Sequence, residues 1–197
     1  PAGQGLIRQL QQTSRKDRMH INPTGITRRQ ASLWLGLGGL TAASALAQSD
    51  SEAALEARAP ALPKVGSVLH VPDIALLDGT PFRAPAGQPL LVYWWASTCP
   101  FCALQSPSMQ ALWQAQRPRG LNMVALSIDK TAEEARAYLH KRGYTFPAAW
   151  ASPSWRRQFP KPKGLPITLL LNGQRQVVLA EKGQMFAEDV EAIGQLL

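Results

Sequence analysis

Two cysteines separated by two residues, Cys99-Pro100-Phe101-Cys102, carry the strongest chemical signal in this 197-residue sequence. A disulfide between them would close a loop too short to stabilise the fold much, so reactivity explains the pair better than a structural role does. A structural zinc site normally takes four ligands, and the sequence has no second cysteine pair to complete one. The spacing therefore favours thiol–disulfide exchange chemistry.

The segments around the cysteines predict how they are held. Leu90–Trp95 is an unbroken apolar and aromatic run, typical of a buried central strand. Residues 100–116 have helical apolar spacing, and Pro100 suits a first helical turn. Cys99 then lies at the helix N-terminus, where free N–H groups and the helix dipole stabilise a thiolate. We expect Cys99 to attack a substrate and Cys102, one turn further, to resolve the mixed disulfide.

Other patterns indicate an α/β fold. The expected further elements are a hairpin over 74–82 around Asp78-Gly79, a strand over 121–128, a helix over 131–142, a hairpin over 167–180 around Asn172-Gly173 and a helix over 186–197. Pro107 lies inside the cysteine helix and is expected to kink it.

The residues around the cysteines resemble those of a known family. Trp95-Ala-Ser-Thr-Cys-Pro-Phe-Cys102 is similar to the W-A-x-x-C-x-x-C motif of thioredoxin-like proteins, Pro107 matches their helix-kinking proline, and Gly164-Leu165-Pro166 their cis-proline loop. The resemblance implies a thioredoxin fold: a central mixed sheet flanked by helices. An N-terminal hairpin, and a strand and helix inserted between the cysteine helix and the cis-proline loop, point to the exported TlpA/ResA-like branch.

The resemblance also implies a function. It predicts a periplasmic thiol-disulfide oxidoreductase that acts on protein thiols and disulfides. The Pro-Phe pair between the cysteines leaves the direction of electron flow open, and we expect a reductase ahead of an oxidase. The cysteine disulfide would be its redox centre, with no other cofactor or metal, and a membrane thiol-reductant donor could feed it. We expect a monomer that does not bind nucleic acid.

Five residues are expected to contact the substrate. In this fold the backbone of the residue before the cis-proline, here Leu165, pairs with an extended substrate peptide. Pro100 and Phe101 of the motif, together with Trp95 and Pro166, would form the apolar surround, although a core role for Trp95 is equally consistent with the sequence.

Two positions depart from the family pattern. Thioredoxins have a buried Asp where this chain has Tyr93, and many TlpA/ResA-like proteins have a Glu where it has Gln105. Neither residue offers a carboxylate to take the proton of Cys102, so water, Tyr93 or another group must do so. A thioredoxin-fold copper carrier or chaperone and a peroxidase are the alternative functions.

The excess of positive charge is concentrated near the N-terminus. Residues 1–47 have six basic and one acidic side chain, whereas the remaining 150 residues have fifteen and twelve. A basic start, an apolar run and Ala45-Leu46-Ala47 predict a signal peptide over 19–47. Arg28-Arg29 resembles a twin-arginine signal; general secretion and an uncleaved anchor are the alternatives.

The rest of the chain is divided accordingly. Residues 1–18 are interpreted as an extension upstream of the true start, 48–63 as a flexible linker and 64–197 as the folded domain. Asp78 and Asp129 are interpreted as turn and loop residues. A basic cluster, Arg156, Arg157, Lys161 and Lys163, is interpreted as a solvated loop rather than as a binding site for an acidic partner.

Overall fold

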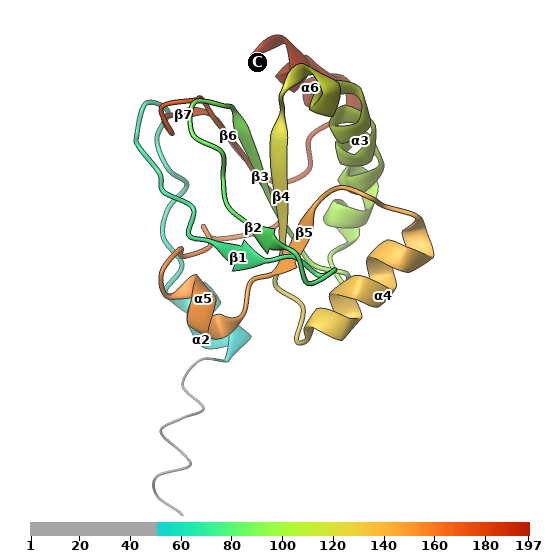
Figure 1. Ribbon diagram of the computed structural model, residues 1–197. Helices are drawn as coiled ribbons and strands as arrows, with labels where there is room; N and C mark the ends of the chain where they lie inside the picture. Colours follow the sequence, from blue (N-terminus) through green and yellow to red (C-terminus); the bar gives the residue numbers. More distant parts are fainter. Residues whose placement is uncertain (1–50) are drawn as a thin grey trace, which may run out of the picture. The chain divides into compact units, whose positions relative to one another are not determined.

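A five-stranded mixed sheet forms the centre of the computed structural model, which describes residues 51–197 (Figure 1). The upstream extension and the signal peptide expected from the sequence lie outside these residues. The sheet strands are β3 (Leu90–Trp95), β4 (Asn122–Ser127), β5 (Ala148–Trp150), β6 (Ile167–Leu171) and β7 (Val177–Lys182). Their spatial order is β5-β4-β3-β6-β7, with β3, β4 and β5 parallel and β6 antiparallel to both β3 and β7.

Helices and a hairpin surround the sheet. They are α2 (Glu52–Ala57), α3 (Pro100–Gln116), α4 (Ala132–Arg142), α5 (Pro153–Arg156) and α6 (Ala187–Ala192), with 3-10 turns at Arg117–Arg119 and Ile193–Gln195. The strands β1 (Ile74–Ala75) and β2 (Pro81–Phe82) pair antiparallel. Since β4, α4 and β5 lie between α3 and β6 in the chain, the structure contains the inserted strand and helix of the expected fold.

Strand β3 divides the core into two parts, because its side chains alternate between the two faces of the sheet. Leu91, Tyr93 and Trp95 pack with residues of α3, α4 and α6, whereas Leu90, Val92 and Trp94 pack with Trp155, Phe159 and other residues of the opposite layer. All six side chains are fully buried. This burial explains why the strand has no polar position.

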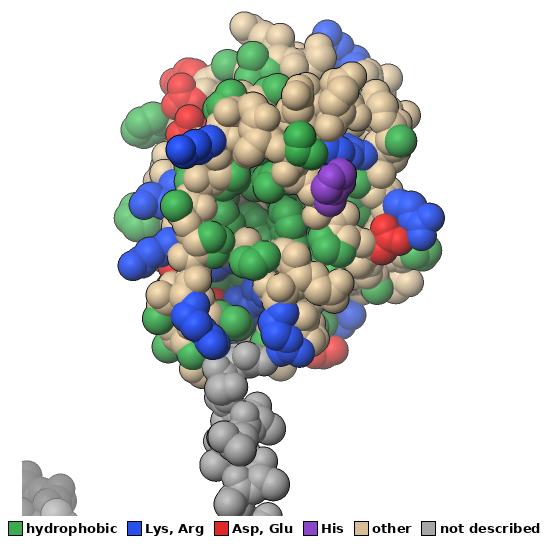
Figure 2. Space-filling model, turned by 90° about the vertical axis from the view of Figure 1, so that its left-hand side faces the viewer, with side chains coloured by type: hydrophobic (Ala, Val, Ile, Leu, Met, Phe, Trp, Pro, Cys, Tyr) green, Lys and Arg blue, Asp and Glu red, His purple; other side chains and the backbone are tan. Residues whose placement is uncertain are grey.

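The two faces are covered differently (Figure 1). The helices α3, α4 and α6 cover one face, while α5, the β1–β2 hairpin and the connecting loops cover the other. Figure 2 shows the side of the domain formed by these loops, where hydrophobic side chains line a hollow and Lys and Arg side chains lie around it.

The expected linker over 48–63 differs from the structure. Residues 52–57 form α2, and Ser51 caps its N-terminus by accepting the N–H of Ala54. Glu52 pairs with Arg156 and Glu56 with Lys161, at 2.6 and 2.7 Å. These ion pairs attach α2 to the domain, so the ordered contacts begin before residue 64. No helix within residues 51–197 has the length and hydrophobicity needed to cross a bilayer.

Candidate active site

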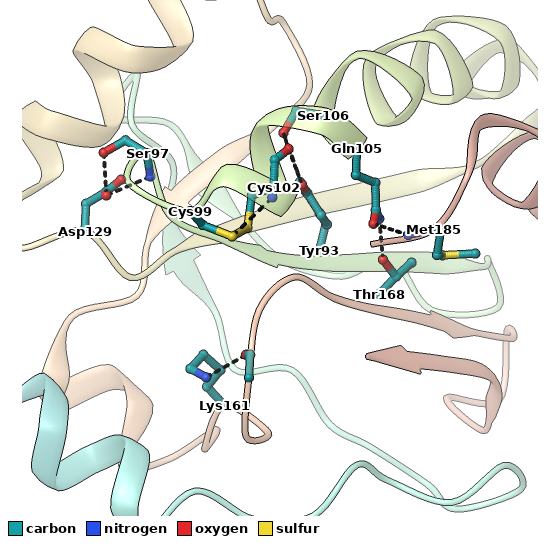
Figure 3. The surroundings of a disulfide bond; sticks show 11 residues. Tyr93, Ser97, Cys99, Cys102, Gln105, Ser106, Asp129, Lys161, Thr168 and Met185 are labelled. Atoms are coloured by element: carbon teal, nitrogen blue, oxygen red, sulfur yellow. Dashed lines mark hydrogen bonds between the residues drawn. A yellow bond between two sulfur atoms is a disulfide. The ribbon is translucent and has the colours of Figure 1, made fainter. Parts of the chain in front are cut away.

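The two cysteines form a disulfide where β3 leads into α3 (Figure 3). Cys99 is the N-cap of α3, its side chain accepting the N–H of Cys102 at 3.1 Å, and Pro100 occupies the first turn. Cys99 is partly exposed, whereas Cys102 is 1% exposed. Because only Cys99 is open to solvent, an incoming disulfide can reach Cys99 first, and Cys102 can act only from within.

A buried acid holds the loop that leads to Cys99. Asp129, which follows β4, accepts the backbone N–H of Ser97 at 2.9 Å and its hydroxyl at 2.7 Å. Its second oxygen accepts the hydroxyl of Ser127 at 2.8 Å. The sequence interpretation of Asp129 as an ordinary loop residue therefore missed its structural role, since the contact with Ser97 joins positions 32 residues apart.

A tyrosine supports Cys102 from the sheet. The Tyr93 hydroxyl donates to the backbone oxygen of Cys102 at 3.3 Å and lies 3.1 Å from the Ser106 hydroxyl. Burial raises the pKa of Tyr93, and the hydrogen bond with Ser106 offsets this only in part. Tyr93 therefore stays protonated at neutral pH, and its role here is to hold the first turn of α3.

Gln105, on α3, joins this helix to β6 and to the segment before α6. Its side-chain amide donates to the Thr168 hydroxyl on β6 at 2.9 Å, and its oxygen accepts the N–H of Met185, ahead of α6, at 2.8 Å. The side chain is fully buried. Figure 3 shows the Gln105 side chain reaching from α3 toward Thr168 and Met185, and Tyr93 pointing from β3 toward Cys102 and Ser106. The two positions that lack the family's carboxylates thus carry structural hydrogen bonds.

The loop before β6 lies beside Cys99. Its Leu165–Pro166 peptide bond is cis, as the resemblance implies, and Gly164 has a positive φ of 97°. Leu165 lines two clefts: one of about 690 Å³ shared with Cys99 and Asp129, and one of about 570 Å³ shared with Phe101. Phe101 and Phe186, which also lines the second cleft, are exposed. The cysteine pair therefore lies beside a cleft with charged lining residues and an open cleft with two exposed aromatic rings.

Four of the five residues expected to contact the substrate lie together in the structure, and the fifth lies elsewhere. Pro100, Phe101, Leu165 and Pro166 lie around the disulfide or in the loop beside it, but Trp95 is fully buried. Its ring lies 5.4 Å from that of Tyr138. Trp95 therefore belongs to the core, because the side chains of β3 that share its face all point under α3 and α4.

The basic cluster also needs correction. The side chains of Arg156 and Lys161 are each only 4% exposed, and both pair with acids of α2, so these two residues are not part of a solvated loop. Within residues 51–197, no three His, Cys, Asp or Glu side chains gather as metal ligands would.

Known proteins share this fold and sequence pattern. The ResA thiol-disulfide oxidoreductase of Halalkalibacterium halodurans is 22% identical over 115 residues, 58% of this chain and 65% of ResA, so the chain spans just under two thirds of that relative. The crystal structure of StoA from Bacillus subtilis has 20% identity and a TM-score of 0.54, covering 66% of this chain and 97% of StoA.

A second solved structure has the same arrangement. A thiol:disulfide interchange protein of the thioredoxin family from Chlorobium tepidum has 20% identity and a TM-score of 0.61, covering 68% of this chain and 97% of its own. Residues 70–179 match the AhpC/TSA family. Because that match covers more than half of the chain, including both cysteines and the cis-proline loop, the chain belongs to the AhpC/TSA family, with the thioredoxin fold of its TlpA/ResA-like relatives.

Proposed function

We propose that this protein is an exported thiol-disulfide oxidoreductase that reduces disulfides of protein substrates in the bacterial periplasm. The observation that carries the proposal is the disulfide between a helix-capping, partly exposed Cys99 and a buried Cys102, next to the open Leu165 loop. The export route proposed is the twin-arginine signal over 19–47, and the protein is proposed to act as a monomer without any other cofactor.

The proposed reaction transfers two electrons. The Cys99 thiolate of the reduced protein attacks one sulfur of a substrate disulfide, forming a mixed disulfide and releasing the first substrate thiolate. Cys102 then gives its proton to water or to the substrate thiolate already released and attacks the Cys99 sulfur, which releases the second substrate thiolate and leaves the Cys99–Cys102 disulfide. A membrane thiol-reductant donor would return two electrons to that disulfide by the same exchange in reverse.

The substrate would bind along the Leu165 loop. No hydrogen bond within residues 51–197 uses the backbone N–H or C=O of Leu165, so both groups are available to pair with an extended peptide. Phe101 and Phe186 provide exposed apolar surface on the same side of this loop. These features support a protein substrate, since a small disulfide would not need a backbone edge.

Two cysteine variants test the proposal. Cys99→Ser is expected to abolish reduction of insulin by the purified protein, because the attacking sulfur is lost. Cys102→Ser is expected to accumulate mixed disulfides with substrates, visible as adducts on nonreducing gels. Insulin reduction at the wild-type rate by the Cys99→Ser variant would exclude the proposed mechanism.

The direction of electron flow is tested separately. We expect the Cys99–Cys102 couple, equilibrated with glutathione, to have a potential near or below about −250 mV, as reductants of this chemistry do. A value above about −150 mV would instead assign the protein to the oxidants.

A further inference from the structure

A buried lysine lies outside the thiol chemistry but close to the loop that borders it. The ammonium group of Lys161 donates to the backbone oxygens of Pro162 and Gly164, at 2.8 and 2.9 Å, and pairs with Glu56 at 2.7 Å. Its side chain is only 4% exposed. An ammonium group has three donors, and these three partners use all of them. Lys161 is thus fixed by the loop it contacts.

Glu56 completes the arrangement from α2. One carboxylate oxygen pairs with Lys161, and the other accepts the backbone N–H of Gly164 at 2.7 Å. Burial would raise the pKa of Glu56, but the hydrogen bonds from Lys161 and Gly164 outweigh burial and lower that pKa. Glu56 is therefore ionised at neutral pH, and the pair holds both the N–H and the C=O of Gly164.

The fixed glycine comes directly before the open peptide edge. Gly164 adopts a φ of 97°, and Leu165, the next residue, has its N–H and C=O unbound within residues 51–197. Leu165 also lines both clefts beside the disulfide. Contacts that fix Gly164 therefore determine where the backbone N–H and C=O groups of Leu165 lie and in which direction they point toward a substrate backbone.

We propose that Lys161 and Glu56 are positioning residues, which hold the Leu165 edge in register for an extended segment of the protein substrate. Helix α2 is then part of the substrate-binding apparatus and not a spacer. This inference rests on the proposed oxidoreductase function and adds a condition to it. Reaction with a peptide disulfide depends on the pair, whereas reaction with a small disulfide, which needs only Cys99, does not.

Two variants of the full chain test this inference. Lys161→Met removes all three donors, and Glu56→Gln keeps the shape but removes the charge of a partly exposed side chain. With a peptide disulfide as substrate, we expect Lys161→Met to lower kcat/KM at least about tenfold, mainly through a higher KM, because charged hydrogen bonds are lost. For Glu56→Gln, which retains an acceptor oxygen, we expect kcat/KM with the peptide disulfide to fall about threefold.

The same variants should react normally with a small aromatic disulfide. We expect rates within about twofold of wild type and an unchanged potential against glutathione, since neither residue contacts the cysteines. Asp73→Asn, which breaks the exposed ion pair with Arg83, is the matched control and should leave both substrates unaffected. Circular dichroism identifies any unfolded variant, and Glu56→Gln keeps the test valid if Lys161→Met does not fold.

The possible outcomes are distinct. An equal loss with both substrates would show that the pair only stabilises the fold, and unchanged kinetics with the peptide would show that it does not set the edge; either result overturns the inference. Wild-type protein that reduces neither substrate would instead overturn the proposed function.

Discussion

Gln105 offers a sharp test of the site because it is fully buried three residues after Cys102. Its amide donates to Thr168 and its oxygen accepts the N–H of Met185. Gln105→Glu keeps the shape and the oxygen that binds Met185. When protonated, the second carboxyl oxygen donates to Thr168 as the amide did; when ionised, it can only accept, from the Thr168 hydroxyl. The variant therefore makes a neutral structural contact depend on pH.

The magnitude follows from the burial. An unfolded glutamic acid has a pKa of about 4.3, and burial without a cation raises the folded-state value above this. Each unit of difference corresponds to about 1.4 kcal/mol, so a carboxyl that stays neutral at pH 7 costs about 3.7 kcal/mol. The N–H of Met185 partly stabilises the anion, and we therefore expect a cost of about 1.5–3.7 kcal/mol.

The sign is fixed by the direction of the shift. A group with a raised folded-state pKa has its full stabilising effect below the unfolded value and loses it as pH rises through the folded value. Urea unfolding of the oxidised wild type and variant is measured from pH 4 to pH 8. We expect free energies of unfolding within about 1 kcal/mol of each other at pH 4 and the stated loss at pH 7.

Gln110→Glu is the matched control. Gln110 is also buried, but its oxygen accepts two backbone N–H groups, those of Thr145 and Phe146, at 2.7 and 3.1 Å. Two backbone donors favour a carboxylate, so this variant should show a weaker rise in cost with pH. A stability difference for Gln105→Glu that does not change between pH 4 and pH 8 would refute the reasoning, because it would mean that the carboxylate is solvated.

Three further predictions concern the residues around the site. Tyr93→Phe removes the hydrogen bonds of the Tyr93 hydroxyl with Cys102 and Ser106 and should lower the free energy of unfolding by about 1–2 kcal/mol without slowing disulfide exchange; a large loss of exchange rate would give the hydroxyl a chemical role. Asp129→Ala leaves the Ser97 N–H without its acceptor and should cost about 1–3 kcal/mol and slow the reaction of Cys99; unchanged urea unfolding and exchange kinetics would contradict this. The lowered pKa of Glu56 means that its pairing with Lys161 stabilises the fold above the unfolded pKa, about 4.3, and is lost as pH falls through the folded value. Glu56→Gln should therefore flatten the acid side of the stability profile, and an identical profile would count against the pairing.

The parts of the site that could be predicted depend on local sequence. The apolar run of β3 specifies a strand buried on both faces, and Pro100 after Cys99 specifies a helix start at the cysteine. Both signals lie within a few residues of the structure they determine. The cis bond before Pro166 came instead from the family resemblance, since local sequence leaves both isomers of a proline peptide open.

The parts that could not be predicted depend on distant partners. Trp94 and Trp95 are adjacent and equally apolar, so the run itself does not say which residue faces the cysteine helix. Arg156 and Lys161 are surrounded by basic residues in the sequence, and the acids that neutralise them, Glu52 and Glu56, lie more than 100 residues earlier. A six-residue helix such as α2 is also too short to be stable alone. Its ion pairs with Arg156 and Lys161 supply stabilisation that its local helix propensity does not.

The same contacts bear on how the thiol pair is tuned. Three acidic residues line the cleft beside Cys99, and each already has a donor: Arg156 for Glu52, Ser97 for Asp129 and the N–H of Lys130 for Glu134. These carboxylates are engaged in holding structure, so none is placed as a free base for Cys102. The backbone group that does face the Cys99 sulfur is the N–H of Cys102, in the first turn of α3. Stabilisation of the Cys99 thiolate must therefore come mainly from the start of that helix. Because the thiolate belongs to the reduced form, stronger stabilisation makes the pair a weaker reductant.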